Sequence, residues 1–371
     1  MKFTKTFLPL FSILFLLNSC AKLHNKPTEN VSLKNAYKND FFIGTALNES
    51  QIEEKDQIEM ELISKEFSSI TPENIMKSMF VQPTKGNYSF DMTDKYVAYG
   101  EKHDMFIHGH TLIWHSQLAP WMSKIKDSSE MEAFMKDHIT TVVSRYKGKI
   151  DSWDVVNEAL NEDGTLRKSV FLNTYGKDFL TLAFKTAAEA DSKTDLYYND
   201  YNLCVPEKRE GVVKIVKELQ ANGAKIDGVG MQGHWSLTKP SLEEIEKSIV
   251  TYSNLGVKVA ITELDINVLP SPWDVVGADV NQKSEASEKM NPYPNSLPDS
   301  IQTQLAQRYA DIFKIFLKHK DKISRVTLWG INDNQTWLND WPIRGRSNYP
   351  LLFDRQNQPK KAYHTVIALK K

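Results

Sequence analysis

The feature that most constrains the fold is an alternation of short apolar segments with longer amphipathic ones, which runs from residue 41 almost to the end of the chain. Short runs rich in β-branched and aromatic residues predict strands, and apolar residues three or four apart predict helices. Strands that alternate with helices indicate βαβ units and a parallel sheet. The strand pattern occurs at Phe41–Leu47, Phe67–Thr71, Met105–Trp114, Ile150–Asn157, Asp195–Tyr201, Asp227–His234, Val257–Leu264 and Ile323–Gly330.

Helical periodicity is clearest between these strands, at 129–147, 172–190, 207–222, 242–254 and 302–318. The first of these helices is predicted to begin near Ser129, which stands three residues before Glu132 as in a capping box, and to stop at Gly148. Eight strands, each followed by a helix, predict an α/β fold: a (β/α)₈ TIM barrel in one domain, with enlarged loops at the C-terminal face of the strands.

A doubly wound open sheet is the alternative for such a pattern. It would usually carry a Gly-rich phosphate-binding turn after its first strand, and only Gly44 is found there, so the barrel is favoured. The longest irregular stretch, Pro270–Pro298, follows the seventh predicted strand. Loops of this length are often functional, and this one should overhang the face where that strand ends.

The N-terminus is predicted to be a targeting segment rather than part of the fold. Positive charges precede an apolar run, Phe7–Leu17, that is too short to span a bilayer. The following Leu17-Asn18-Ser19-Cys20 resembles a bacterial lipoprotein signal, which implies cleavage before Cys20 and lipidation of that residue. An ordinary secretory signal with a chance cysteine is the alternative. We therefore expect a signal peptide at 1–19, a tether at 20–37 and the barrel domain at 38–371, anchored by lipid at the cell envelope, on its periplasmic or cell-surface side.

Composition excludes some partners. The chain is 41% hydrophobic and 25% charged with a formal net charge of -1, so nothing in its charge predicts binding to nucleic acid. The membrane is expected to be contacted only through the lipid, and the domain is expected to be a monomer. Cys204 is the only thiol besides Cys20, so no disulfide is expected within the mature chain.

Polar and aromatic side chains gather where the predicted strands end. Two strand-like runs, Trp153–Ala159 and Ile261–Asp265, each carry a glutamate at this point, where barrel enzymes keep their catalytic residues. A single glutamate at a strand end is more often part of a surface ion pair, but two of them on different strands favour an acid/base and nucleophile pair. Further polar groups and indoles follow other strands, at Glu73–Lys77, His108–Gln117, Tyr198–Asn202, Gln232–His234, Trp329 and Trp337.

This set of side chains suits a polysaccharide. Amides, histidines and carboxylates bind sugar hydroxyls, indoles stack on sugar faces, and cleavage of a glycosidic bond requires a proton donor and an opposing carboxylate. The sequence shows no Ser-His-Asp arrangement. His108 and His110 could be a zinc pair, but no third ligand follows at a suitable spacing, so we expect no metal and no cofactor.

Four of these segments, Trp153–Ala159, Ile261–Asp265, His110–Gln117 and Trp329–Trp337, resemble the signatures of glycoside hydrolase family 10, the endo-β-1,4-xylanases. The match extends over nearly all of residues 41–368, in the family's motif order. The resemblance implies a retaining mechanism, with Glu158 as general acid/base and Glu263 as nucleophile. It also implies sugar contacts on the glycone side from Glu73, Asn74, Lys77, His110, Trp114, Gln117 and Asn157, contacts beside the nucleophile from Gln232 and His234, cleft walls from Trp329 and Trp337, and aglycone contacts from Tyr201 and Asn202.

Two residues are expected to support these groups from behind. Asp265 lies two positions after Glu263, on the same strand face, and is expected to orient His234 as it donates to Glu263. His115 is expected to be such a supporting residue, and contact with a sugar and a buried structural role are left as equal alternatives for it. The chain departs from the family pattern at Ser78, where a bulky residue is usual, which puts the local packing near the glycone side in doubt.

The expected function is therefore the hydrolysis of internal bonds of xylan by double displacement through a glycosyl-enzyme. Burial and the facing Glu263 carboxylate should raise the pKa of Glu158, while Glu263 stays ionised. A β-1,4-glucanase of the same barrel type is one alternative, because xylose differs from glucose only in lacking the C6 hydroxymethyl group. A non-catalytic xylan-binding surface lipoprotein is the other, although such a protein has no need of both carboxylates.

Overall fold

The computed structural model describes residues 1–4, 31–272, 279–285 and 287–370. Its contacts divide the chain into Met1–Val31 and Ser32–Lys371, and every element named below belongs to the second unit. Residues 5–19 of the predicted signal peptide, and Cys20, lie outside the described residues. Within the described parts, no helix has both the length and the apolar character needed to cross a membrane.

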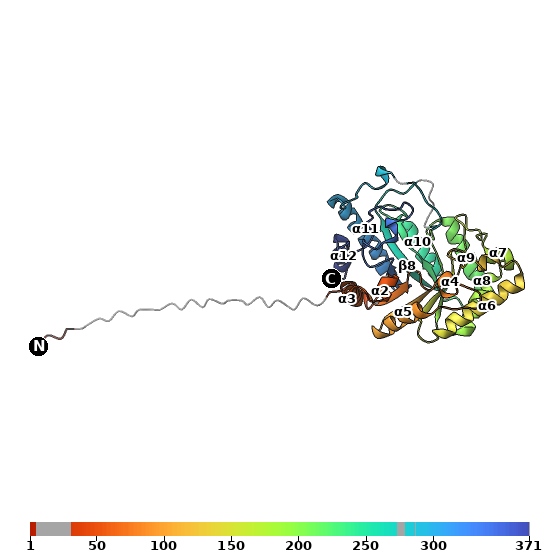
Figure 1. The fold of residues 1–371 in the computed structure, drawn as a ribbon. Helices are drawn as coiled ribbons and strands as arrows, with labels where there is room; N and C mark the ends of the chain where they lie inside the picture. The colour runs from red at the N-terminus through yellow and green to blue at the C-terminus, as the bar shows by residue number, and fades with distance from the viewer. Residues whose placement is uncertain (5–30, 273–278, 286, 371) are drawn as a thin grey trace. The chain divides into compact units, whose positions relative to one another are not determined.

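Parallel strands form a closed barrel in the unit Ser32–Lys371, with helices around it (Figure 1). The strands pair in the order β1-β2-β3-β4-β5-β6-β8-β9, and β9 pairs back with β1. The predicted (β/α)₈ TIM barrel is therefore confirmed. The strands are β1 Phe42–Leu47, β2 Ser69–Pro72, β3 Phe106–Trp114, β4 Ser152–Asn157, β5 Asp195–Asp200, β6 Gly228–Met231, β7 His234–Ser236, β8 Lys258–Asn267 and β9 Ile323–Leu328.

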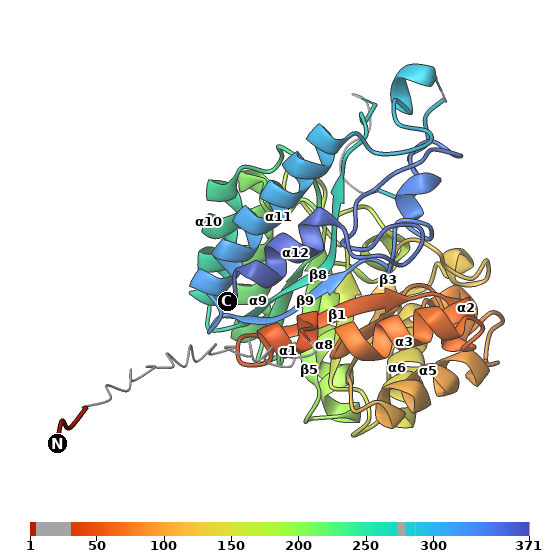
Figure 2. The same cartoon turned by 90° about the vertical axis from the view of Figure 1, so that its left-hand side faces the viewer.

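Helices cover the outside of the barrel, and Figure 2 shows α11 and α12 side by side on one flank. The α-helices are α1 Leu33–Tyr37, α2 Glu49–Ile52, α3 Gln57–Glu66, α4 Ser78–Val81, α5 Asp91–Lys102, α6 Ser128–Arg145, α7 Val170–Tyr175, α8 Phe179–Ala190, α9 Pro206–Ala221, α10 Leu242–Ser253, α11 Asp299–Lys318 and α12 Lys361–Ala368. Short 3-10 turns are η1 Met122–Lys124, η2 Glu288–Met290 and η3 Trp337–Asn339.

Two helical predictions need correction. The helix predicted at 172–190 is two helices, because Gly176 follows α7 with a φ of 90°, a conformation that ends a helix and favours glycine. The predicted cap at Ser129 is also wrong. The N-cap of α6 is Asp127, whose carboxylate accepts a hydrogen bond from the Glu130 amide at 2.9 Å.

The strand predicted at 227–234 is interrupted. Gly233 has a φ of 84°, and the turn at this residue separates β6 from β7. β6 is a strand of the barrel, whereas β7 pairs with the C-terminal end of β8. His234 of β7 is the register partner of Asp265 in β8. The interruption therefore brings His234 to the rim of the barrel beside the strand that carries Glu263.

The folded domain begins earlier than the sequence predicted. Leu33 and Tyr37 are spaced by one helical turn, so both face the core from α1, and both are fully buried. The Tyr37 hydroxyl donates to the Val366 carbonyl at 2.8 Å. The compact unit starts at Ser32, so the predicted boundary at residue 38 and the predicted tether through residue 37 include a helix of the domain.

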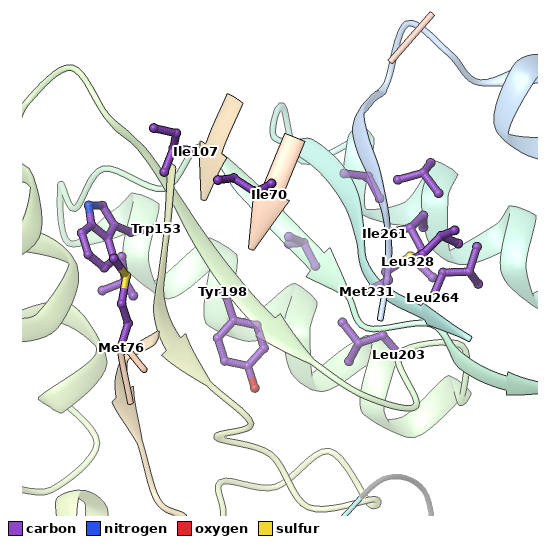
Figure 3. Packing of buried hydrophobic residues seen from close by; sticks show 14 of the residues in the cluster. Ile70, Met76, Ile107, Trp153, Tyr198, Leu203, Met231, Ile261, Leu264 and Leu328 are labelled. Carbon is purple, nitrogen blue, oxygen red and sulfur yellow. The ribbon is translucent and has the colours of Figure 1, made fainter. Parts of the chain in front are cut away.

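The core lies inside the barrel and between the barrel and its helices. Figure 3 shows part of this packing, with Ile261 and Leu264 of β8 beside Leu328 of β9. Glycine makes room for large rings within the sheet. A Cβ atom on Gly109 of β3 would lie 2.2 Å from the ring of Trp153 on the neighbouring strand, so only glycine fits there without rearrangement.

Candidate active site

The C-terminal ends of the strands surround a cleft of about 490 Å³. Both predicted catalytic carboxylates and most of the predicted sugar-binding residues line it. The lining residues are Glu73, Asn74, Lys77, Met79, His110, Trp114, Ser116, Gln117, Asn157, Glu158, Gln232, His234, Glu263, Val280, Asn281, Trp329 and Trp337.

Glu158 follows β4 with a φ of 57°, a left-handed conformation that L residues rarely adopt. Consecutive side chains of a regular strand point to opposite faces, so this turn allows both Asn157 and Glu158 to line the cleft. The Glu158 carboxylate accepts hydrogen bonds from Trp114 Nε1 at 2.8 Å and Gln232 Nε2 at 2.9 Å. Burial raises its pKa, these two donors oppose the rise, and the charge of Glu263 adds to it. The net direction is upward, as a proton donor requires.

Glu263 lies within β8 and is held by two donors. Its carboxylate accepts from Asn199 Nδ2 at 2.9 Å and contacts His234 Nε2 at 3.1 Å. Burial raises the pKa of Glu263, but the hydrogen bond from His234, the charges of His110 and His234, and the Asn199 amide outweigh it and leave the pKa below its usual range. The two carboxyl groups of the cleft are therefore shifted in opposite directions, which suits one acid and one anion.

His234 is fixed from behind by Asp265. The imidazole Nδ1 lies 3.0 Å from Asp265 Oδ2, and the same oxygen accepts from Trp337 Nε1 at 2.8 Å. Burial lowers the pKa of His234, but the charge and hydrogen bond of Asp265 together with those of Glu263 raise it to about 10. His234 is then an imidazolium that donates to one carboxylate from each ring nitrogen.

Asn199 of β5 is a residue to which sequence reasoning gave no role. Thr262 Oγ1 donates to its Oδ1 at 2.6 Å, which fixes the amide orientation. Its Nδ2 donates to Glu263 and, at 3.0 Å, to Asn157 Oδ1. The available signal was position, because Asn199, one residue before the end of β5, is in register with Asn157 at the end of β4.

Asn157 joins the two carboxylates through amide groups. Its Oδ1 accepts from Asn199 Nδ2 and lies 3.5 Å from Gln232 Nε2, which also donates to Glu158. A chain of amides therefore runs from Glu158 to Glu263. Because the Asn157 oxygen faces these donors, its Nδ2 is left to donate to a ligand in the cleft.

A cluster beside β2 forms another part of the cleft. Lys77 Nζ donates to Asn74 Oδ1 at 2.9 Å and lies 4.8 Å from the centre of the Trp114 ring. Burial lowers the pKa of Lys77, and burial raises the pKa of Glu73 although the charge of Lys77 opposes it. Ser78, where the family pattern has a bulky residue, is buried as the first residue of α4.

The two histidines of β3 have different environments. His110 lines the cleft, with its Nδ1 2.9 Å from Asp154 Oδ2 and its ring edge-on to Trp329. His108 lies deeper, between Ser152 Oγ at 2.7 Å and Asp154 Oδ2 at 2.9 Å, so both its nitrogens are occupied. Among the described residues, no group of three or more histidine, cysteine, aspartate or glutamate side chains is arranged to hold a metal ion.

Besides Asp265, three predicted residues lie away from the cleft lining. Tyr201 is 3% exposed, and its hydroxyl accepts a hydrogen bond from Arg167 at 2.6 Å. Asn202 donates to Glu162 at 2.9 Å and lines a neighbouring pocket instead. His115 lies beyond Trp114, where burial lowers its pKa to about 4. Because the Tyr201 hydroxyl accepts from Arg167, its own proton is left to donate, and the expected sugar contact from Tyr201 stays a prediction.

Four lining residues were not predicted. Met79 and Ser116 stand next to motif residues, so their position could have been inferred from the motifs. Val280 and Asn281 come from the irregular stretch 270–298, which carries no recognisable motif. Residues 273–278 and 286 of that stretch lie outside the described residues.

Known proteins resemble this chain over most of its length. Residues 32–369 match the family described as glycosyl hydrolase family 10. Endo-1,4-beta-xylanase A of Xylanibacter ruminicola is 43% identical over 361 residues, which cover 96% of this chain and 97% of the relative. An endo-1,4-beta-xylanase of Geobacillus stearothermophilus is 40% identical over 350 residues, covering 91% of this chain and 98% of the relative.

Solved structures agree. That of a GH10 endoxylanase retrieved from a sugarcane soil metagenome has a TM-score of 0.88 and 47% identity, and the match covers 91% of this chain and 100% of that one. The barrel and the cleft with its two carboxylates are thus accompanied by a match, over residues 32–369, to one family of glycoside hydrolases. The chain belongs to glycosyl hydrolase family 10.

Proposed function

We propose that this glycoside hydrolase is a retaining endo-β-1,4-xylanase, which cleaves internal β-1,4-xylosidic bonds of xylan through a covalent glycosyl-enzyme. The observation that carries the proposal is the pair Glu158 and Glu263, buried in one cleft with pKa values shifted in opposite directions. The relatives that match over nearly their whole length are named endo-1,4-β-xylanases, and these names support xylan as the substrate.

In the first step, the Glu263 carboxylate attacks the anomeric carbon while Glu158 gives its proton to the departing glycosidic oxygen. The hydrogen bonds that Glu263 accepts from Asn199 and His234 keep its carboxylate ionised and fix its orientation. Asn157 Nδ2 is placed to bind the sugar 2-hydroxyl, a bond that should strengthen in the transition state.

In the second step, water replaces the enzyme at the anomeric carbon. Once Glu263 is esterified its negative charge is gone, and that charge is one of the causes that raise the pKa of Glu158. The pKa of Glu158 should therefore fall, so that Glu158, already deprotonated, takes a proton from the water. Glu263 leaves as a carboxylate, and both groups return to their starting states.

Substrate binding follows from the remaining lining residues. Glu73, Asn74 and Lys77 offer charged and amide groups to sugar hydroxyls, and Trp329 and Trp337 offer faces for stacking. Glu158 and Glu263 supply all the acid, base and nucleophile chemistry that the reaction needs, so the proposal includes no cofactor.

Rates on two polymers test the proposal. Wild-type protein should release reducing ends from xylan faster than from carboxymethyl-cellulose, and NMR of the first product should show the β-anomer. Faster turnover of carboxymethyl-cellulose would favour a β-1,4-glucanase, an α-anomer would refute retention, and binding to xylan without new reducing ends would favour a non-catalytic binding protein.

We also propose that the protein is exported and anchored through a lipid on Cys20. The support is the N-terminal sequence: charged residues, a short apolar run and Leu17-Asn18-Ser19-Cys20. Metabolic labelling with a fatty acid should mark the wild-type protein and not the Cys20→Ala variant. Label that persists in Cys20→Ala would rule out the assigned attachment residue.

A further inference from the structure

A tight turn over residues 279–282 forms part of one wall of the cleft. The Gln282 amide donates to the Asp279 carbonyl at 3.0 Å, and the Asp279 carboxylate accepts from both the backbone and the side-chain nitrogen of Asn281, at 3.0 and 3.1 Å. Asp279 therefore fixes the turn through its own side chain. Val280 and Asn281, at the tip, line the cleft.

The turn is attached to the proton donor's side of the cleft. Asp279 Oδ2 lies 3.6 Å from a guanidinium nitrogen of Arg167, and both side chains are mostly shielded from solvent. Arg167 Nε in turn donates to the backbone carbonyl of Glu158 at 3.2 Å, and its Nη2 donates to both the Tyr201 hydroxyl and the Leu160 carbonyl. Arg167 thus joins the turn to the ends of β4 and β5.

A second attachment leads to the nucleophile's side. Trp341 Nε1 donates to the Asp279 carbonyl at 3.1 Å, and Trp341 stacks on Trp337 with ring centres 4.6 Å apart. Trp337 donates to Asp265, which holds His234 against Glu263. The turn is therefore held on one side by Arg167, which contacts Glu158, and on the other by Trp341, which leads through Trp337 to the residues that hold Glu263.

These attachments place the turn with respect to the bond that is cut. The cluster expected to hold the glycone, Glu73, Asn74 and Lys77, follows β2, whereas Arg167 and Tyr201 follow β4 and β5. Resting on the proposed function, we infer that the turn 279–282 walls the subsite of the first sugar on the leaving-group side. Asn281 is then a specificity-determining contact for that sugar, and Asp279 and Arg167 are positioning residues.

The chemistry of Asn281 fits such a contact. Its amide nitrogen donates to Asp279, which orients the amide, and none of the described residues donates to its amide oxygen. An oriented amide oxygen at the wall of the cleft can accept from a sugar hydroxyl. A neutral hydrogen bond of this kind should change catalytic efficiency about 3- to 10-fold.

Two substrates separate this role from a general one. Xylotetraose places sugars on both sides of the cut, whereas 4-nitrophenyl β-xylobioside puts only nitrophenol on the leaving-group side. We expect Asn281→Ala to lower kcat/KM about 3- to 10-fold on xylotetraose and less than about 2-fold on the nitrophenyl xylobioside. Asp279→Ala should shift the ratio of the two efficiencies in the same direction. This variant removes the carboxylate that accepts from Asn281 and that pairs with Arg167.

Lys283→Ala is the matched control, since Lys283 is exposed on the same segment and does not line the cleft. Equal losses on both substrates, or no loss on either in Asn281→Ala, would overturn the inference. Such results leave the proposed function standing, because that function is tested by the wild-type protein's release of reducing ends from xylan.

Discussion

Glu158 and Glu263 are chemically identical side chains that the protein places in different states. Both are buried, which alone would raise the pKa of each. The difference lies in their donors: Glu158 has a neutral indole and a neutral amide, whereas Glu263 has an amide and the imidazolium of His234. The hydrogen bond from His234 is the largest cause that lowers the pKa of Glu263, and the charges of His110 and His234 and the Asn199 amide add to it. The division of labour therefore depends chiefly on His234.

The role of Glu158 leads to a first prediction. Glu158→Ala should lower kcat on xylan by about 10²- to 10⁴-fold, because it removes both the proton donor and the base. Azide should restore turnover of an activated aryl xyloside, since azide attacks the glycosyl-enzyme from the face that Glu158 vacates. The product should be the β-azide, identified by NMR. An α-azide, or full activity without azide, would contradict the assigned role.

The role of His234 leads to a second prediction. Glu263 must be ionised to attack, so its pKa sets the acidic limb of the pH profile of kcat/KM. The His234 hydrogen bond is the largest of the causes that lower this pKa. In His234→Gln the pKa of Glu263 should rise, and the acidic limb should move to higher pH. His115→Gln is the control, because His115 does not touch Glu263. An unmoved acidic limb in His234→Gln would show that this pKa is set elsewhere.

For single residues, the sequence predicted which side chains meet in the cleft better than it predicted their hydrogen-bond partners. Glu158, Glu263 and their neighbours are adjacent in short motifs, so their placement follows from the strand ends. The hydrogen bond from Asn199 to Glu263, and the one from Arg167 to Tyr201, come from side chains on another strand and on the loop after β4. Such contacts depend on how the strands are arranged in the barrel, which no local pattern encodes.

At the scale of helices and strands, too, the sequence predicted that an element exists better than it predicted the contacts at its ends. The start of α6 shows it, because two residues near it could cap the helix and only Asp127 does. Asp127→Ala should lower the free energy of unfolding by about 1 kcal/mol, as expected for the loss of an N-cap, and Ser129→Ala by less than about 0.5 kcal/mol. Urea denaturation measures both. A larger loss for Ser129→Ala would place the cap where the sequence alone suggested.

Strand β6 offers a test of how an element positions the site. A Cβ atom on Gly230 would lie 2.4 Å from Asn199 Oδ1, whereas one on Gly228 would lie 2.0 Å from the Tyr197 ring. Gly230→Ala and Gly228→Ala should each lower the free energy of unfolding by about 1–3 kcal/mol through overpacking. Only Gly230→Ala displaces the amide that holds Glu263, so it alone should lower kcat about tenfold or more. Equal kcat values in the two folded variants would contradict this role of Asn199.

The alternation of strands and helices was sufficient to predict the barrel but not its interruptions. The breaks at Gly176 and Gly233 occur at single glycines with positive φ, and a glycine in sequence does not reveal its φ. α1 was missed for a different reason. Its two large apolar residues are too few for a periodic signal, and its burial depends on α12 and α11, which lie at the other end of the chain.

At the scale of the whole domain, α1 joins the beginning of the fold to its end. The Leu33 amide donates to Glu66 Oε2 at 2.9 Å, and Tyr363 of α12 donates to the same oxygen at 3.1 Å. Glu66 is thus shared by the first and last helices of the domain. Residues 32–37 therefore help to hold the C-terminal helix against the barrel, which a flexible tether could not do.

Tyr37 gives the prediction that belongs to this scale. Its ring is fully buried, 5.3 Å from that of Phe41 and 5.5 Å from that of Phe313, and its hydroxyl donates to Val366 in α12. Tyr37→Ala should lower the free energy of unfolding by about 3–5 kcal/mol, since it leaves a cavity between the two ends of the chain. Tyr37→Phe keeps the ring and should lose only about 1 kcal/mol, for one hydrogen bond. Urea denaturation of both variants measures the difference, and a loss below about 1 kcal/mol in Tyr37→Ala would mean that the stable domain begins after residue 37, as the sequence had suggested.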